Sequence, residues 1–378
     1  VSGWGQIYLH DVKTGAQRQL TDALAEHSRA AWVQGMRTLG WAADDSAIFA
    51  LRNERGRVRL WRYGLNGAGA EVGAASDYSE FESISVAPND GMIACIVSSS
   101  TVPSRLVTFS PEAAGGARVI TPAFNKTLSA DALSDARLVQ WRSSDGDMVH
   151  GLYYPPVETT VDRPPAIVTS HGGPTAQRTL AFYPDVQFFV SRGYAVLQVN
   201  YRGSFGFGRE YMLKMRGEWG KVDREDLLSG ARFLVENGLG DGERLVAMGG
   251  SAGGASVLLA LIHQPGLFAA GVCSYPVTDM LALSTETHRF ERHYNHNLLG
   301  PLPQAEAIYR CRSALLRADE IDDPLLLFHG TNDKVVPPEQ SAGIAVSLKQ
   351  RGIPHEYHLF QGEGHGWRRE ETIVEYFA

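Results

Sequence analysis

The sequence predicts an α/β fold class: a mostly parallel sheet with helices over residues 131–378, preceded by an antiparallel β region over residues 1–130. Two observations predict this division. Before about residue 130, short alternating strand patterns are separated by turn residues, whereas from about Leu138 strand patterns alternate with helical ones. Alternation of strands and helices is typical of a parallel sheet that is covered on both faces. The best interdomain joint is residues 123–137.

Composition limits the class of protein. The chain has 378 residues, of which 44% are hydrophobic and 20% are charged, enough for one large core or two. Its net charge of −7 and its lack of a long apolar run give no reason to expect a nucleic-acid or membrane partner. The three cysteines, Cys95, Cys273 and Cys311, form no metal or disulfide pattern, which favours a reducing, cytoplasmic compartment. We expect no cofactor, and a homo-oligomer is compatible with the sequence.

In the first part, strands are expected at Gln6–Leu9, Ala47–Leu51, Val58–Tyr63, Met92–Val97 and Arg105–Phe109. The segment 41–48 also matches the segment 86–93, with identical residues at Ala42/Ala87, Asp45/Asp90 and Ile48/Ile93. The spacing of roughly 45 residues is close to the period of a propeller blade. About 130 residues supply only about three blades, and closed propellers have roughly four to eight. We therefore expect a partial β-propeller whose upstream blades are missing.

In the second part, strands are expected at Ala166–Ser170, Tyr194–Asn200, Leu245–Met248, Ala269–Ser274, Pro324–His329 and His355–Phe360. The clearest helical patterns are Asp223–Glu236 and Gly254–His263. The last residues, Glu370–Ala378, begin an amphipathic helix that we expect to continue beyond the given sequence.

The segment Gly249–Gly253, with Ser251 at its centre, has the form G-x-S-x-G. It lies between an apolar strand pattern and a helical pattern, which is the setting of a nucleophile elbow. A side chain at Gly249 or Gly253 would crowd the tight turn on which the serine must stand. The helix N-terminus favours negative charge that develops beside the serine.

A serine nucleophile needs a base, and the base needs an acid to orient it. Asp333 and His365 follow Ser251 in that order, each on a loop after a predicted strand. Loops at the carboxyl ends of parallel strands gather at one edge of a sheet. The chain also contains other candidates: Asp323 and Glu363 as the acid, and His329, His355 and His358 as the base.

Two backbone N–H groups are expected to bind the oxyanion. One belongs to Ala252, the residue after the nucleophile. The other belongs to the loop His171–Pro174, where two glycines leave backbone N–H groups accessible to a ligand.

Together, these motifs and Asn200–Gly208 resemble the prolyl oligopeptidase family of serine peptidases, near its acylaminoacyl-peptidase and dipeptidyl-aminopeptidase-like branch. The resemblance covers roughly residues 135–378. It implies an α/β-hydrolase domain after a β-propeller, a triad of Ser251, Asp333 and His365, and oxyanion donors at Gly173 and Ala252. Other branches use a tyrosine at the position of His171, and this chain has none there.

The resemblance also suggests residues that bind substrate. Arg292 is similar to an arginine that reaches the substrate, with Arg289 as a close competitor. The histidines at 288, 293 and 296 fit no zinc template, so no metal is expected. We expect an apolar pocket near Phe207, Trp219 and Tyr275, and we expect Tyr201 to bind substrate as well.

The sequence thus predicts a serine peptidase that hydrolyses short peptides. Two alternatives remain: a carboxylesterase-like hydrolase with the same triad, and a catalytically silent binding scaffold. Acylated peptides, free dipeptides and internal peptide bonds all stay open as substrates.

Overall fold

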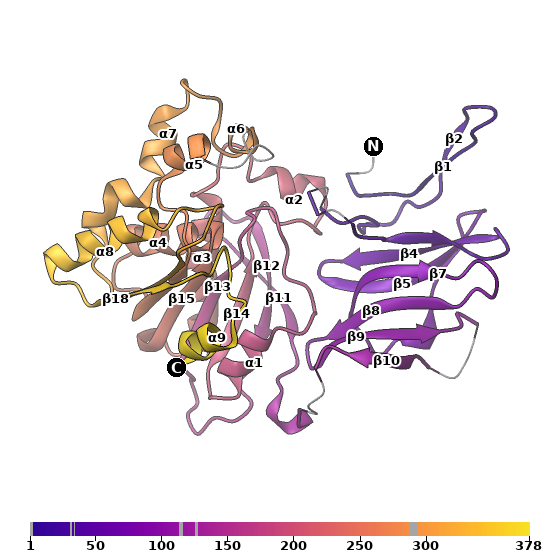
Figure 1. Cartoon of the computed structure of the whole chain (residues 1–378), viewed down its shortest axis with the longest axis horizontal. Coiled ribbons are helices and arrows are strands. Elements are labelled where there is room, and N and C mark those ends of the chain that lie inside the picture. Colours follow the sequence, from indigo (N-terminus) through magenta and orange to yellow (C-terminus); the bar gives the residue numbers. More distant parts are fainter. Residues whose placement is uncertain (1–2, 31, 34, 113–115, 125–127, 287–292) are drawn as a thin grey trace. The chain divides into compact units, whose positions relative to one another are not determined.

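The computed structural model describes residues 3–30, 32–33, 35–112, 116–124, 128–286 and 293–378 (Figure 1). The chain forms two compact units. The first comprises Val1–Ala136, Gln177–Ser191 and Ser204–Met212, and the second comprises Arg137–Ala176, Arg192–Gly203 and Leu213–Ala378. Two later segments therefore join the first unit, although a single boundary near residue 130 would assign them to the second. The buried Gln187 shows why, because its amide donates to the carbonyls of Ser100 and Ser134 at 2.9 Å.

The first unit is antiparallel β-structure. Its strands are β1 (Tyr8–His10), β2 (Gln17–Gln19), β3 (Leu39–Trp41), β4 (Ala47–Glu54), β5 (Arg57–Gly64), β6 (Gly69–Glu71), β7 (Glu80–Val86), β8 (Ile93–Ser99), β9 (Val102–Phe109) and β10 (Arg118–Pro122). Strands β3–β6 form one four-stranded sheet and β7–β10 another, and β1 pairs with β2. Short 3-10 turns lie at Gly73–Ala75 and Ala130–Ala132. In the described residues, two sheets thus have the four strands of a propeller blade, where the sequence led us to expect about three blades.

The internal repeat has a structural basis. Each copy is the turn between the first and second strands of a four-stranded sheet, so Asp45 lies between β3 and β4 and Asp90 between β7 and β8. Strand β4 is buried on both faces. Phe49 packs into the core shared by the two sheets, whereas Ala50 packs with residues of the β1–β2 segment. Alternate side chains of one strand thus contribute to two cores.

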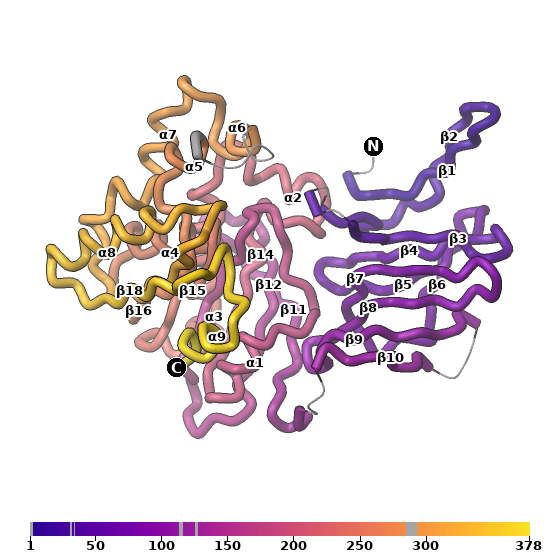
Figure 2. The backbone as a smooth tube through the Cα atoms, in the orientation of Figure 1, coloured from indigo at the N-terminus to yellow at the C-terminus, as the bar shows by residue number. Residues whose placement is uncertain are grey.

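The second unit, whose backbone is traced in Figure 2, is built on an eight-stranded sheet. The strand order in this sheet is β11-β12-β14-β13-β15-β16-β17-β18. Its strands are β11 (Arg137–Arg142), β12 (Met148–Tyr154), β13 (Ala166–Ser170), β14 (Ala195–Asn200), β15 (Leu245–Gly250), β16 (Ala270–Ser274), β17 (Leu325–Gly330) and β18 (His355–Phe360). Strands β11 and β12 pair antiparallel, and all pairs from β14 to β18 are parallel. The predicted mostly parallel sheet is confirmed, within a residue or two at each strand end.

The helices are α1 (Pro184–Val190), α2 (Arg209–Leu213), α3 (Val222–Glu236), α4 (Ala252–His263), α5 (Met280–Glu286), α6 (Tyr294–Leu299), α7 (Glu306–Cys311), α8 (Glu339–Arg351) and α9 (Glu370–Phe377). Short 3-10 segments lie at Gly242–Arg244 and Ala314–Glu320. In the described part of the chain, every helix is too short or too polar to cross a bilayer.

Helices cover both faces of the large sheet. Helices α3 and α4 pack together on one face, and the Cys273 thiol lies 3.7 Å from a carbonyl of α4. The next residue of β16, Ser274, points to the opposite face, where its hydroxyl contacts Tyr376 of α9 at 3.3 Å. Buried apolar residues of the sheet and of α4 form one core. This core fixes the strands whose ends carry the candidate site.

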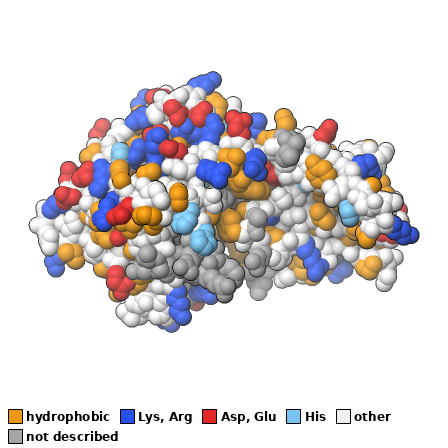
Figure 3. Space-filling view, turned by 90° about the horizontal axis from the view of Figure 1, so that it is seen from above, with side chains coloured by type: hydrophobic (Ala, Val, Ile, Leu, Met, Phe, Trp, Pro, Cys, Tyr) orange, Lys and Arg blue, Asp and Glu red, His pale blue; other side chains and the backbone are white. Residues whose placement is uncertain are grey.

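The surface view shows basic, acidic and hydrophobic side chains interspersed over the face it displays (Figure 3). Charge on this face is therefore mixed rather than concentrated in one sign.

Candidate active site

Ser251 occupies a strained turn between β15 and α4. Its backbone has φ 56° and ψ −125°, a region that side-chain-bearing residues rarely adopt. A β-carbon on Gly249 would lie 2.5 Å from the Gly253 carbonyl oxygen, and one on Gly253 would collide with the Ser170 carbonyl oxygen. The expectation that these two glycines permit the turn is thus confirmed. This geometry is typical of a nucleophile elbow.

Backbone hydrogen bonds hold the turn in place. The Ser251 N–H donates to the Ser274 carbonyl at 3.0 Å, and the Ser251 carbonyl accepts from the N–H of Gly254 and of Val277. The elbow is therefore tied to β16 and to the first turn of α4. Helix α4 begins at Ala252, directly after the serine, and the backbone N–H groups at the N-terminus of a helix favour negative charge there.

The loop after β13 lies against the elbow. A β-carbon on Gly172 would approach the Ser251 β-carbon and the Gly250 carbonyl oxygen to 3.2 Å each. Gly173 has φ +117°, a conformation open to glycine but strained for other residues. The two glycines therefore bring backbone close to Ser251 without side chains between.

His365 and Asp333 form a hydrogen-bonded pair. Asp333 Oδ2 lies 2.7 Å from His365 Nδ1, and because a carboxylate only accepts, Nδ1 carries the proton. This bond leaves Nε2 of the neutral ring as the basic nitrogen. The Asp333 side chain has no exposed surface, whereas 22% of the His365 side chain is exposed. The acid is thus enclosed and the base is accessible.

Four groups surround the Asp333 carboxylate. Besides His365, the N–H groups of Val335 and Val336 donate to Oδ1 at 2.9 and 3.0 Å, and His329 Nε2 lies 3.4 Å from Oδ2. Burial by itself raises the pKa of Asp333, but hydrogen bonds from His329, His365 and Val336 hold that pKa well below its usual range. The carboxylate is therefore ionised across the neutral pH range.

His329 is a partner that the sequence did not reveal. It lies at the end of β17 with no exposed surface, bonded through Nε2 to the Val336 carbonyl at 2.9 Å and through Nδ1 to the Ser341 hydroxyl at 2.7 Å. A carbonyl only accepts, so Nε2 carries the proton and faces Asp333. The available signal was its position inside a buried strand, since a buried imidazole must find hydrogen-bond partners.

Tyr275 lies between the elbow and the histidine. Its ring is 4.4 Å from the His365 ring and 5.2 Å from the Trp367 ring, measured between centroids. A β-carbon on Gly250 would lie 3.2 Å from the same Tyr275 ring. Tyr275 has φ +41°, a second strained residue at this edge. One side chain thus lies close to both the residue before Ser251 and the candidate base.

The other candidate acids have different partners. Asp323 lies before β17, at the opposite end of that strand from Asp333, and accepts from the Gly266 N–H at 2.8 Å. Glu363 is buried and accepts from the N–H groups of Arg368 and Arg369, where α9 begins. Glu363 thus shapes the loop that carries His365.

The other candidate bases are likewise engaged elsewhere. His355 contacts the Ile353 carbonyl at 2.8 Å, and His358 lies 2.9 Å from Glu356. Both histidines belong to β18, so neither lies on the loop that meets Asp333.

The predicted substrate-binding residues lie in different surroundings. Tyr275 lies at the site, but Tyr201 has no exposed surface and Trp219 only 2%, so neither is placed to touch a substrate directly. Phe207 belongs to the first unit and packs against Tyr211 with ring centroids 5.0 Å apart. Arg292 and its competitor Arg289 lie outside the described residues. In the part of the chain that is described, no group of three or more potential metal ligands is found.

Comparison with known proteins agrees with this geometry. The model of the prolyl oligopeptidase family matches residues 180–378, more than half of the chain. The chain belongs to this family. Its two parts correspond to the family's fold, an α/β-hydrolase with a β-propeller-like N-terminal part.

Among relatives of this prolyl oligopeptidase family member, dipeptidyl aminopeptidase BIII of Pseudoxanthomonas mexicana is 34% identical over 213 residues, covering 55% of this chain and 31% of that protein. Acylamino-acid-releasing enzyme 1 of Oryza sativa is 28% identical over 222 residues, covering 56% of this chain and 29% of that protein. The solved structure of a puromycin-hydrolyzing peptidase of Mycobacterium tuberculosis matches with a TM-score of 0.92 and 31% identity, covering 99% of this chain and 57% of that one. The chain thus spans little more than half of the solved relative.

Proposed function

We propose that this protein is a serine peptidase that hydrolyses short peptides through an acyl-enzyme. The observation that carries the proposal is the 2.7 Å contact between His365 and Asp333, together with a serine on a strained elbow that follows a strand of the same sheet. Tyr275 packs against His365 and lies close to the residue before Ser251, which supports the convergence of the serine and the histidine into one site.

In the proposed mechanism, Nε2 of neutral His365 removes the proton from the Ser251 hydroxyl as the oxygen attacks the peptide carbonyl. Asp333, ionised and enclosed, holds the His365 tautomer and stabilises the imidazolium that forms. The imidazolium then protonates the leaving amine, and water attacks the acyl-enzyme with His365 again as the base.

The tetrahedral intermediate carries a negative oxygen that needs donors. We assign the backbone N–H groups of Gly173 and Ala252 to this role. The approach of Gly172 to Ser251 and the start of α4 at Ala252 support the assignment. Removing one such donor typically costs about 3–4 kcal/mol of transition-state stabilisation.

The substrate class rests on the relatives. One relative is named as a dipeptidyl aminopeptidase, another as an acylamino-acid-releasing enzyme, and the solved one as a puromycin-hydrolyzing peptidase, and each name refers to a small substrate or product. We propose that this protein also acts on small substrates, with Tyr275 beside the site and Arg292 as a substrate contact.

The free thiols of Cys95, Cys273 and Cys311 support a cytoplasmic location.

A fluorophosphonate probe tests the mechanism. We expect the wild-type protein and Ser46→Ala, which alters an exposed serine of the first unit, to be labelled equally, and Ser251→Ala not to be labelled. Equal labelling of Ser251→Ala would contradict the assignment of the nucleophile, and no labelling of the wild type would favour a binding scaffold. Turnover of p-nitrophenyl esters without turnover of acyl-peptides would favour a carboxylesterase.

A further inference from the structure

The Tyr201 hydroxyl bridges the two ends of the loop that carries Gly172 and Gly173. It lies 2.7 Å from the Pro174 carbonyl and 2.9 Å from the His171 carbonyl. Both carbonyls only accept, so the phenolic proton points to this pair. One side chain thus holds the residues before and after the glycine pair.

His171 completes the arrangement. Its Nδ1 lies 2.9 Å from the Gly172 carbonyl and 3.2 Å from the Tyr201 hydroxyl, so the proton is on Nδ1 and the hydroxyl can accept from it. The His171 and Tyr201 rings are stacked, with centroids 4.2 Å apart and planes inclined by 22°. The hydroxyl therefore both donates to and accepts from the loop.

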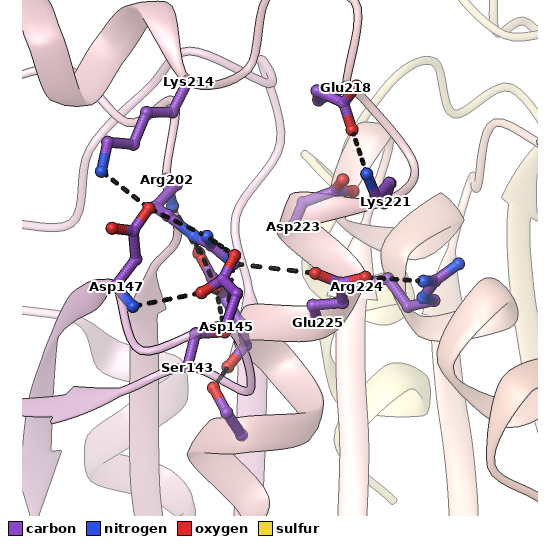
Figure 4. A network of polar contacts seen from close by, with 12 residues as sticks. Ser143, Asp145, Asp147, Arg202, Lys214, Glu218, Lys221, Asp223, Arg224 and Glu225 are labelled. Carbon is purple, nitrogen blue, oxygen red and sulfur yellow. Dashed lines mark hydrogen bonds and ion pairs between the residues drawn. The ribbon is translucent and has the colours of Figure 1, made fainter.

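Tyr201 itself lies in a part of the chain that is anchored by hydrogen bonds. It follows β14 directly, and the next residue, Arg202, is the centre of a polar network (Figure 4). The Arg202 N–H donates to Asp226 Oδ2 at 2.7 Å, and the guanidinium of Arg202 bonds the same carboxylate. Asp226 lies on α3, so the chain at Tyr201 is anchored to a helix on one face of the sheet.

The glycine pair has no side chains of its own to fix its position. Gly172 approaches Ser251 closely, and Gly173 has a positive φ of +117°. A small displacement of this loop would therefore move the Gly173 N–H relative to the serine. Misplacement of a catalytic group by about 1 Å can lower a rate roughly 100-fold.

We propose that Tyr201 is a positioning residue, whose hydroxyl holds the His171–Pro174 loop so that the Gly173 N–H meets the oxyanion. This inference rests on the proposed function and replaces the predicted contact of Tyr201 with substrate. It explains why a tyrosine with no exposed surface adjoins a site at which it cannot touch a ligand.

The test is Tyr201→Phe, with Tyr309→Phe as the matched control. Tyr309 is also fully buried and donates to one backbone carbonyl, that of Gly300 at 3.1 Å, on α7. Both variants lose one buried hydroxyl and keep the ring. We compare the rate of labelling by a fluorophosphonate, the kcat and KM for N-acetyl-alanyl p-nitroanilide, and the affinity for a peptide boronic acid, which mimics the tetrahedral intermediate.

In Tyr201→Phe we expect kcat to fall roughly 10- to 100-fold with KM nearly unchanged, and boronic-acid affinity to fall in parallel. Tyr309→Phe should leave all three quantities within about twofold of wild type. Thermal unfolding establishes how far each variant is destabilised. Rates are then compared at a temperature well below the unfolding midpoint of the less stable variant.

A kcat in Tyr201→Phe equal to that of Tyr309→Phe overturns the positioning role. So does a fall in kcat that leaves boronic-acid affinity unchanged, because the loss would then not concern the oxyanion. These outcomes differ from failure of the proposed function, in which wild-type protein itself would not react with the fluorophosphonate at Ser251.

Discussion

Replacing Arg202 with methionine removes the cation at the centre of a buried polar network (Figure 4). Only 2% of the Arg202 side chain is exposed, and none of Asp226. The guanidinium reaches Asp226 Oδ1 at 2.7 Å through Nη2 and at 3.0 Å through Nε, and also contacts Asp145, Asp147 and Ser143. Burial lowers the pKa of Arg202, but its bonds to Asp226 and Asp145 outweigh burial and raise that pKa, so the residue stays charged.

The loss can be estimated from what remains around Asp226. In Arg202→Met the carboxylate keeps the N–H of residue 202 and the Ser143 hydroxyl, at 2.7 and 2.8 Å, but loses its counter-ion. Removing one partner of a buried ion pair typically lowers the free energy of unfolding by about 3–5 kcal/mol. Asp145 and Asp147 are nearly half exposed, so water screens them and they add little.

The assay is urea unfolding followed by far-ultraviolet circular dichroism. Arg310→Met is the control, because Arg310 pairs with Glu306 on the surface at 58% and 48% exposure, and its loss should cost about 0–1 kcal/mol. The double variant Arg202→Met/Asp226→Asn should be more stable than the sum of the two single losses predicts, by at least about 1 kcal/mol. If Arg202→Met is as stable as Arg310→Met, the buried network does not stabilise the folded protein and the reasoning is refuted.

Three further predictions concern the candidate site. Asp333→Asn should lower kcat by roughly 10⁴-fold, because the amide no longer selects the His365 tautomer; a loss below tenfold, from steady-state kinetics, would argue against this role. The pKa of Asp333 is depressed in the folded protein, so its stabilising contribution is present above the unfolded-state pKa of about 3.9 and is lost as pH falls through the folded value; wild type should therefore exceed Asp333→Asn in urea stability at pH 7, with the gap narrowing below about pH 4. Gly172→Ala should reduce fluorophosphonate labelling by at least about tenfold while the protein stays folded, because the new β-carbon would lie 3.2 Å from the Ser251 β-carbon; unchanged labelling would show that the loop can move aside.

Several features followed from local patterns. The strand–turn–helix around Ser251 could be predicted because glycine spacing and apolar periodicity act over a few residues, and the repeat at residues 41–48 and 86–93 marked equivalent turns of two sheets. The order of Ser251, Asp333 and His365, each after a strand, placed them at one edge of the sheet. The pairing of His365 with Asp333 agrees with that expectation.

The sequence by itself determined the class of the sheet, the elbow and a short set of candidate acids and bases, since these depend on the period and order of residues along the chain. The tertiary structure decided among them. It placed Asp333, rather than Asp323 or Glu363, against His365, and it placed His329 on another side of the same carboxylate. It also buried Tyr201 beneath the glycine loop and drew segments 177–191 and 204–212 into the first unit. These outcomes depend on side chains that are far apart in the sequence and meet in the fold. A local sequence pattern does not show which distant group will satisfy a buried donor or acceptor.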